Sequence, residues 1–276
     1  MNVTVTGACG HLGTFVTRAL VEGGCAVRAT DRSLPRDFPV RVEIANLLDR
    51  EACYGLVDGA DAVVHLGNYP GMLRGISAQQ LFCENTTMNM NVFQAAQEAG
   101  VKKILFSSSV QAFSGKQGAN EAAPRSLPYL PLDGDVPPNP GNPYALSKQV
   151  AEAMLAYFAR DGQMDCVAVR FPRLLDPEWL KHLKGGLVNS GEGFAFLHLT
   201  DAAALILACL NASLPGFRIY FAASTGNGLG KPAAEVIREH YANVPLRRPL
   251  EQIDSLVDIS RIQAETGWTP KNNNVF

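Results

Sequence analysis

Short apolar runs alternate with longer segments of helical periodicity over roughly the first 170 residues. The short runs predict strands at Val3–Thr6, Ala26–Thr30, Arg41–Ile44, Ala62–Leu66, Lys103–Ser107 and Cys166–Val169. The longer segments predict helices at Leu12–Gly23, Arg50–Val57, Leu81–Ala99 and Tyr144–Arg160. Continuous apolar strands that alternate with helices are typical of a parallel sheet covered on both faces. With right-handed crossovers, the pattern predicts a doubly wound α/β fold.

Two stretches break this alternation. The segment from Ser114 to Pro143 contains seven prolines, which exclude a helix and predict a long ordered loop that forms a wall or lid of a substrate site. From about Asp176 onward the pattern is mixed, which indicates a small lobe. We therefore predict a main domain over residues 1–170 and a small substrate-facing lobe over 171–276, interleaved with the sheet.

The composition excludes several function classes. With 276 residues, 47% of them hydrophobic, the chain can bury a substantial core. Its 24 basic and 26 acidic residues form no long run of one charge, which argues against nucleic-acid binding. No apolar run is long enough for a membrane span, and Met1 opens no export signal, so we expect a cytoplasmic protein. The six cysteines lack metal-binding spacing, so we expect reduced thiols and no metal site.

A glycine-rich loop, Gly7-Ala8-Cys9-Gly10-His11-Leu12-Gly13, follows the first predicted strand and opens the first helix. In a Rossmann-type loop, the first glycine permits a tight turn, the second lets the backbone approach a pyrophosphate, and the third lets the helix pack on the strand. The helix N-terminus, with His11 and Leu12, would present free N–H groups to the phosphates. An ordinary strand–helix turn is the alternative, because three glycines alone are a weak signal.

Asp31, at the end of the second predicted strand, strengthens the cofactor interpretation. A carboxylate there can accept hydrogen bonds from an adenosine ribose and would repel the extra phosphate of NADP. Arg32 is adjacent and could instead bind that phosphate. We favour NAD as the cofactor, with NADP as the alternative.

Tyr144 and Lys148 are spaced i, i+4 at the start of a predicted helix and should share one face. A free tyrosine has a pKa near 10, and a nearby ammonium together with an oxidised nicotinamide ring should lower it, which would make Tyr144 a usable base. A solvated helix face is the alternative for this pair. Ser109, in the run Phe106-Ser107-Ser108-Ser109, follows the predicted strand at the edge where parallel sheets bind ligands. Asn85 could order a water or the nicotinamide, or could simply be a polar residue at a helix start.

Together these motifs resemble an extended short-chain dehydrogenase/reductase of the NAD-dependent epimerase/dehydratase type. The resemblance covers nearly the whole chain and rests on motifs in family order. They are Gly7–Gly13, Asp31, Asn46-Leu47, Val64–Gly67, Asn85, Phe106–Ser109, Tyr144–Lys148, Val169–Pro172, Leu199–Ala202 and Gly267–Pro270.

The resemblance implies a role for each residue. Tyr144 would be the acid/base, Lys148 would tune it and bind the nicotinamide ribose, and Ser109 would orient the substrate oxygen. Asn46 and Leu47 would flank the adenine, and Gly67 would pass under the cofactor. The remaining residues expected at the cofactor are Leu66, Asn85, Ser107 and Phe171, and those expected at the substrate are Asn68, Val110, Gln111 and Arg173.

The chain is partly similar to uronate dehydrogenases in its compact size, in His65-Leu66-Gly67 and in the ending from Gly267 to Phe276. It departs at Val110, where that group has Asn, and the expected carboxylate-binding Arg has no clear counterpart. The side chains that could replace this Arg are Arg173, Lys181, His182 and Lys184, although for residues 181–184 we favour a solvated helix face.

The leading function is therefore hydride transfer between NAD and a hydroxyl-bearing carbon of a sugar or sugar acid. An NAD-dependent sugar or nucleotide-sugar epimerase is the alternative enzyme, and a non-catalytic dinucleotide sensor is the alternative of another class. The predicted helices 81–99 and 144–160 carry apolar residues around much of their circumference, which predicts a homodimer that pairs through them.

Overall fold

Seven parallel strands form one sheet in the order β3-β2-β1-β4-β5-β6-β9. The computed structural model describes residues 1–276 apart from 36, 72–74, 115–126, 177, 179–189 and 275–276. Strand order reverses next to β1, from which β2 and β3 extend one way and β4, β5, β6 and β9 the other. The sheet confirms the predicted doubly wound, Rossmann-type architecture. The strands span β1 Asn2–Thr6, β2 Ala26–Asp31, β3 Val42–Ile44, β4 Ala62–His65, β5 Lys103–Ser109, β6 Asp165–Phe171 and β9 Phe217–Phe221.

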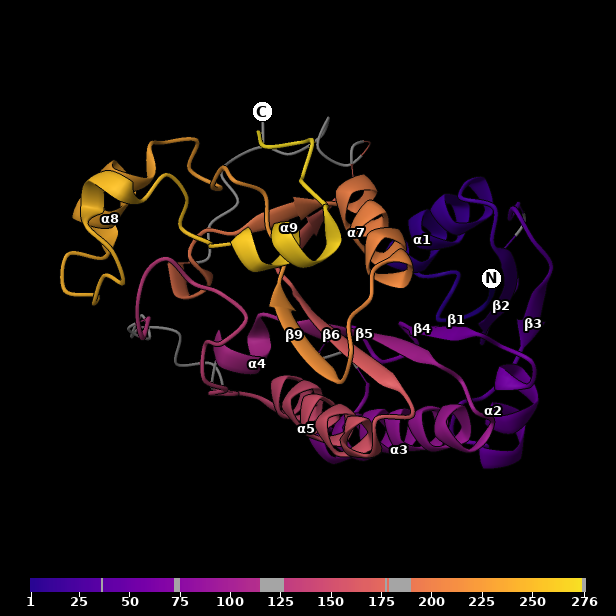
Figure 1. Ribbon diagram of the computed structural model, residues 1–276. Coiled ribbons are helices and arrows are strands. Elements are labelled where there is room, and N and C mark those ends of the chain that lie inside the picture. The colour runs from indigo at the N-terminus through magenta and orange to yellow at the C-terminus, as the bar shows by residue number, and fades with distance from the viewer. Residues whose placement is uncertain (36, 72–74, 115–126, 177, 179–189, 275–276) are drawn as a thin grey trace.

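Helices cover both faces of this sheet (Figure 1). Helices α1 (His11–Glu22) and α7 (Leu199–Asn211) pack together on one face. Helices α2 (Arg50–Val57), α3 (Ala78–Glu98) and α5 (Pro143–Phe158) form the layer on the other face. Each layer encloses its own buried hydrophobic cluster. The middle of β5 is apolar on both sides because successive side chains enter opposite clusters, as Ile104 and Leu105 do.

Residues beyond 170 complete the sheet as well as the lobe. Strand β9, which the sequence did not predict, pairs in parallel with β6 and forms one edge of the sheet. Helix α7 lies against α1, far from it in the sequence (Figure 1). Residues beyond 170 thus contribute both a strand and a covering helix to the main sheet. The predicted domain boundary at residue 170 stays a prediction.

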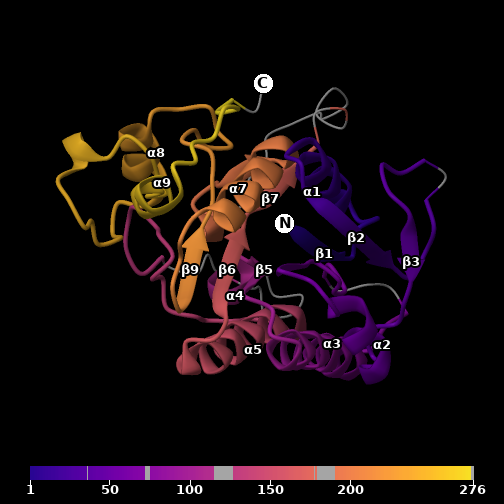
Figure 2. The same cartoon turned by 45° about the vertical axis from the view of Figure 1, so that its right-hand side comes forward.

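Helices α8 (Ala233–His240) and α9 (Ser260–Thr266) follow β9 along the chain and lie above it in Figure 2. The described part of the proline-rich segment joins the chain between them through two isolated bridges, Leu130 with Leu246 and Leu132 with Val257. Residues 115–126 of that segment, and Lys181, His182 and Lys184, lie outside the described residues. The smaller elements are α4 Gln111–Ser114, η1 Ala159–Asp161, β7 Arg173–Leu175, η2 Ser190–Glu192, β8 Phe196–His198, α8 Ala233–His240, η3 Leu250–Gln252 and α9 Ser260–Thr266.

Asp201 anchors the C-terminal tail to helix α7. Its carboxylate accepts hydrogen bonds from the backbone N–H groups of Lys271 at 3.1 Å and Asn272 at 2.9 Å. Its backbone carbonyl accepts a hydrogen bond from the Trp268 indole at 3.1 Å. The sequence motifs at 199–202 and 267–270 therefore meet in space.

Within the described part of the chain, no helix combines the length and apolar character needed to cross a membrane. The same residues contain no group of three or more His, Cys, Asp or Glu side chains arranged to hold a metal ion.

Candidate active site

A cleft of about 990 Å³ runs along the carboxyl ends of the strands, where the strand order reverses. Doubly wound sheets bind ligands at this position. Among the described residues, every predicted site residue except Asn46 and Asn85 lines the cleft. The lining residues among those predicted are Gly7, Gly10, His11, Leu12, Gly13, Asp31, Arg32, Leu47, Leu66, Gly67, Asn68, Ser107, Ser109, Val110, Gln111, Tyr144, Lys148, Phe171 and Arg173.

The glycine-rich loop forms one end of the cleft. Gly7 has a φ of +66°, and a Cβ atom there would lie 2.8 Å from the backbone nitrogen of Gly67. A Cβ atom at Gly13 would lie 2.2 Å from the carbonyl oxygen of Gly7. At Gly10 a Cβ atom would meet only that same oxygen, at 3.3 Å, so packing within the protein does not explain Gly10. The loop is thus a backbone cradle that is open at Gly10 and faces the N-terminus of α1, as a pyrophosphate site requires.

Asp31 lies beside this cradle with its carboxylate fixed. One oxygen accepts a hydrogen bond from the backbone N–H of Cys9 at 2.9 Å, and the other accepts one from the backbone N–H of Arg32 at 2.7 Å. The Arg32 guanidinium turns toward Tyr69, with its carbon 5.2 Å from the centroid of the ring and Nη1 3.4 Å from the phenol oxygen. The Tyr69 phenol in turn donates a hydrogen bond to Glu84 at 2.5 Å. Arg32 is therefore engaged by a neighbour that also lines the cleft.

Asn46 does not line the cleft, although Leu47 does. The Asn46 side chain accepts a hydrogen bond from the backbone N–H of Leu48 at 3.1 Å and so stabilises the turn before α2. Only one of the two residues expected to flank an adenine is therefore in position to do so.

Tyr144, Lys148 and Ser109 come together at the other end of the cleft. Asn142 caps α5 by accepting a hydrogen bond from the backbone N–H of Ala145 at 2.8 Å, which places Tyr144 in the first turn. Lys148 follows one turn later, with its Nζ 5.6 Å from the centroid of the Tyr144 ring. Ser109 ends β5 and hydrogen-bonds with the Tyr144 phenol.

Burial controls the ionisation of this group. It raises the pKa of Tyr144 to about 12, against a hydrogen bond with Ser109 that lowers it, and the Glu192 charge raises it further. Burial lowers the pKa of Lys148 to about 7, against the Glu152 carboxylate, which raises it. The chain alone therefore does not lower the pKa of Tyr144, and the predicted lowering, which relied on an oxidised nicotinamide ring as well as on Lys148, stays a prediction. Burial is the largest of these influences because it disfavours the charged phenolate.

Asn85 does not reach the cleft. Its side chain is fully buried, accepts a hydrogen bond from the backbone N–H of Tyr69 at 2.9 Å and donates one to the Ser147 hydroxyl at 3.2 Å. The expected direct role at a water or a nicotinamide is not supported by this position. The contacts instead join α3, α5 and the segment after β4.

Glu192 is the most significant residue of the cleft that sequence reasoning missed. It is 7% exposed, and its carboxylate accepts a hydrogen bond from the Ser114 hydroxyl at 3.2 Å. No local motif marks it. It ends η2, shortly before β8, and β8 pairs with β7 so that Phe196 is opposite Arg173, which also lines the cleft. The other lining residues that were not predicted are Cys9, Thr30, Ser33, Ala45, Tyr69, Pro70, Met88, Ser108, Pro172, Leu174 and Ala195.

A model of the NAD-dependent epimerase/dehydratase family matches residues 3–220 of the chain. The chain is 27% identical to a UDP-glucose 4-epimerase of Azospirillum brasilense, over 99% of this chain and 88% of the relative. It is 30% identical to a uronate dehydrogenase of Pseudomonas syringae pv. tomato, over 60% of this chain and 57% of the relative. A 3 beta-hydroxysteroid dehydrogenase/Delta 5-->4-isomerase of Mycobacterium tuberculosis is also 30% identical, but the match spans only 45% of that relative.

Solved structures share the fold. MoeE5 in complex with UDP-glucuronic acid and NAD has a TM-score of 0.72 at 20% identity, with 99% of this chain and 94% of that chain covered. A mutated uronate dehydrogenase has a TM-score of 0.70 at 21% identity, with 99% and 82% covered.

Proposed function

The chain belongs to the NAD-dependent epimerase/dehydratase family, and on that premise we propose that it transfers a hydride between NAD and a hydroxyl-bearing carbon of a sugar or sugar acid. The observation that carries this proposal is the single cleft described above. It has the glycine cradle and Asp31 at one end and Ser109, Tyr144 and Lys148 at the other.

The residues of the cleft fit a dinucleotide. The cradle, open at Gly10, would hold the pyrophosphate, and Leu47 and Gly67 would line the path of the adenosine. Asp31 would accept hydrogen bonds from the adenosine ribose. NAD is favoured over NADP because both oxygens of Asp31 are fixed in place as acceptors and Arg32 is directed to Tyr69.

The catalytic end of the cleft supports proton transfer at a substrate oxygen. When bound, NAD supplies the hydride acceptor, and its charged ring favours the phenolate of a neighbouring tyrosine. Tyr144 would take the proton of the substrate hydroxyl as general base, and Ser109 would donate a hydrogen bond to the same oxygen. Lys148 would stabilise the phenolate and bind the nicotinamide ribose. Glu192 and Arg173, on the lobe side, would contact other groups of the substrate.

Epimerisation is the second candidate. It is favoured by the UDP-glucose 4-epimerase relative, which matches 99% of this chain, whereas the uronate dehydrogenase match covers 60%. Both reactions use the same first step at Tyr144. They differ in whether the hydride returns to the substrate before product leaves.

One experiment separates these functions. The protein is incubated with NAD and a panel of free sugars, uronic acids and nucleotide sugars, and followed by NADH absorbance and by NMR of the sugar. A dehydrogenase produces one NADH for each sugar oxidised, and an epimerase interconverts two sugars with no net NADH. A protein that binds NAD but changes no member of the panel would support the sensor and contradict the proposal.

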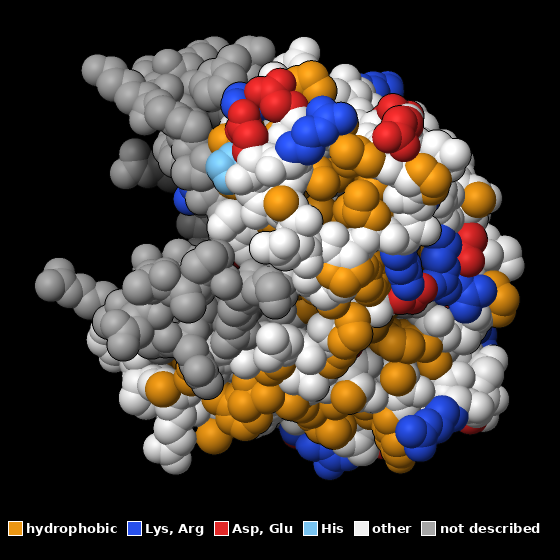
Figure 3. Space-filling view, turned by 90° about the vertical axis from the view of Figure 1, so that its left-hand side faces the viewer, with side chains coloured by type: hydrophobic (Ala, Val, Ile, Leu, Met, Phe, Trp, Pro, Cys, Tyr) orange, Lys and Arg blue, Asp and Glu red, His pale blue; other side chains and the backbone are white. Residues whose placement is uncertain are grey.

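We also propose that the chain forms a homodimer through the segments 81–99 and 144–160. Large apolar side chains reach solvent from α3 and α5, with Met90 38%, Leu146 41% and Tyr157 60% exposed. Hydrophobic side chains gather along the lower edge of the molecule in Figure 3, the side on which Figure 1 shows α3 and α5. Solution scattering should give the mass of a dimer, and Tyr157→Lys should reduce it to that of a monomer. A monomeric wild-type protein would contradict the proposal.

A further inference from the structure

A chain of hydrogen bonds leads from the end of β1 to the candidate catalytic lysine. The Thr6 hydroxyl lies 2.6 Å from Nδ1 of His65, and Nε2 of His65 lies 2.9 Å from Oδ1 of Asn89. Asn68 donates from Nδ2 to that same Asn89 oxygen at 2.8 Å. Lys148 donates from Nζ to Oδ1 of Asn68 at 3.0 Å. Thr6, His65 and Asn89 are each at most 1% exposed, so the chain is shielded from water.

The direction of each hydrogen bond follows from its neighbours. The Lys148 ammonium can only donate, so in the charged form the Asn68 oxygen accepts and the Asn68 nitrogen donates. The Asn89 oxygen accepts from Asn68, so His65 must donate to it through Nε2 and accept from Thr6 at Nδ1. Burial lowers the pKa of His65 to about 3, which keeps the ring neutral and able to play both roles. Asn68 therefore cannot rotate without losing its bonds at both ends.

Few groups compensate for the burial of the Lys148 ammonium. Nζ also donates to the carbonyl oxygen of Ser107 at 2.7 Å and lies 4.5 Å from the centroid of the Phe106 ring. The charged or titratable side chains near it are Glu152, one helix turn further along α5, and Tyr144 on the same helix. His65 faces it from β4 and is neutral. Because the lysine titrates near neutral pH, each acceptor changes the fraction of protein that carries its charge.

We infer that Asn68 is a positioning residue: its amide oxygen holds the ammonium of Lys148 in the cleft, and Asn89 and His65 hold the amide. The amide oxygen of Asn68 is occupied by Lys148 and its nitrogen by Asn89 and by the Gly67 carbonyl oxygen. A role of Asn68 at the substrate stays a prediction. The effect of Asn68 on turnover rests on the proposed function, whereas its effect on Lys148 does not.

The test measures the ionisation of Lys148 directly. Protein labelled with ¹⁵N-lysine is titrated by NMR, and the Lys148 signal is assigned by its loss in Lys148→Met. Removing one hydrogen bond to a buried cation should lower the pKa of Lys148 by about one unit in Asn68→Leu. Asn68→Asp has nearly the same shape and adds a negative charge, so it should raise this pKa above the wild-type value. Asn85→Ala removes a buried amide from α3, the helix that also carries Asn89, and should leave the pKa of Lys148 unchanged.

A Lys148 pKa that is unchanged in Asn68→Leu would overturn the inference. If the leucine variant does not fold, an unchanged pKa in Asn68→Asp would overturn it instead. Where a substrate is known, the pH profile of kcat gives a second test. The alkaline limb of Asn68→Leu should lie about one pH unit below that of the wild type, because Lys148 loses its proton at a lower pH in the variant. A wild-type protein that turns over no sugar would refute the proposed function and leave the titration able to decide the role of Asn68.

Discussion

The cofactor half and the substrate half of the cleft are built differently. In the cofactor half, the close approaches join residues near each other in sequence, as between Gly13 and the carbonyl oxygen of Gly7, or residues at the ends of neighbouring strands. In the substrate half, Ser114 meets Glu192, and the Asn142 amide donates to the Gln111 side chain at 3.2 Å. These contacts connect segments that are far apart in the chain.

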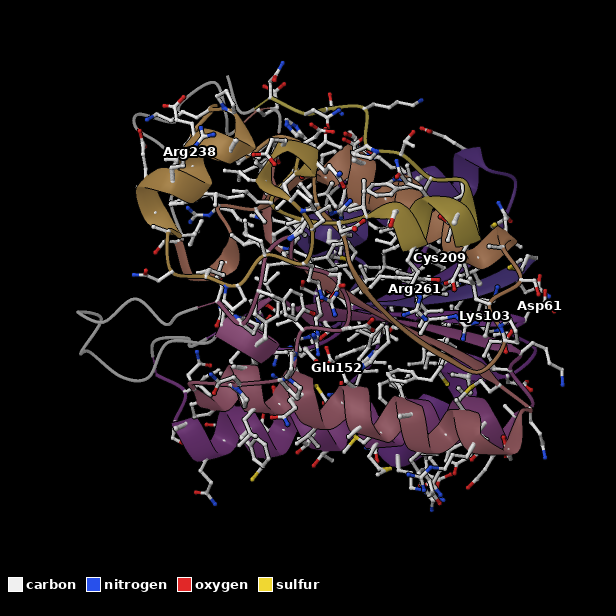
Figure 4. All side chains as sticks on the ribbon, turned by 60° about the vertical axis from the view of Figure 1, so that its left-hand side comes forward. Asp61, Lys103, Glu152, Cys209, Arg238 and Arg261 are labelled. Carbon is white, nitrogen blue, oxygen red and sulfur yellow. The ribbon has the colours of Figure 1, made fainter. Side chains whose placement is uncertain are left out.

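This difference predicts which substitutions should disrupt each half of the cleft. A short motif specifies the cofactor half, so a single added methyl group can disrupt it. The substrate half depends on buried polar contacts that hold loops to the sheet. The strongest of these involves Glu152, which Figure 4 places between α5 and the strands. It forms a two-point ion pair with Arg170, at 2.9 and 2.8 Å, and accepts a hydrogen bond from Ser108 at 2.6 Å.

Loss of the Glu152 charge should have the largest effect on the folded state. Arg170 is 2% exposed and also donates to the carbonyl oxygen of Val136 at 2.6 Å, so it ties the described part of the proline-rich segment to α5. Glu152→Gln leaves a buried cation without its counter-ion and should lower the free energy of unfolding by about 3–5 kcal/mol, measured by urea denaturation. Glu235→Gln, which removes an exposed partner of Lys231, should cost under about 1 kcal/mol. Equal losses in the two variants would contradict this view of the substrate half.

The cofactor half should fail at Gly13. An alanine Cβ there would lie 2.2 Å from one backbone oxygen and 2.6 Å from another, so the loop must shift away from its cradle shape. We expect Gly13→Ala to weaken NAD binding roughly 100-fold, or by about 2.7 kcal/mol, measured by fluorescence titration. Gly55→Ala is the matched control, because a Cβ at this helical position meets no atom within 4 Å. NAD affinity that is unchanged in Gly13→Ala would mean that the dinucleotide does not lie on this loop.

The same contrast explains how much of the structure the sequence could predict. Local periodicity or fixed spacing determines the strands through β6, the glycine cradle, Asp31 and the Tyr144–Lys148 pair. The structure contains these strands, and the cradle, Asp31, Tyr144 and Lys148 line the cleft at their carboxyl ends, as predicted. Glu192 and strand β9 depend on pairing with distant segments, which no local pattern reveals. The burial of Tyr144, which raises its pKa, is likewise a property of the whole fold and not of a local pattern.

Asp31 should set the choice between NAD and NADP. Asp31→Asn keeps the shape of the side chain but removes the charge that would repel a 2′-phosphate, so the preference for NAD should fall about tenfold, or about 1.4 kcal/mol. The ratio of kcat/KM values for the two cofactors measures it. Glu43→Gln, on the neighbouring strand β3, removes an exposed charge and should leave the ratio unchanged. A preference for NADP in the wild-type protein would assign Arg32, not Asp31, as the deciding residue.

Glu192 should have the smallest effect, a shift in the pH profile. Burial is the main reason for the high pKa of Tyr144, and the Glu192 charge adds to it. Glu192→Gln should therefore lower the pKa of Tyr144, so that the phenolate forms at lower pH. The acidic limb of kcat for sugar oxidation should move down by up to about one pH unit. Movement in the opposite direction would show that the carboxylate does not act on Tyr144 through its charge.

The central claim is that Tyr144 moves a proton at the end of the same cleft that holds NAD. The most direct measurement is the single-turnover rate of Tyr144→Phe with NAD and the sugar identified from the panel, together with the NAD affinity of this variant. We predict an affinity within about twofold of wild type and a rate lower by about 10²–10⁴-fold, the usual contribution of a positioned acid/base group. A variant that binds NAD and reacts at the wild-type rate would contradict the account.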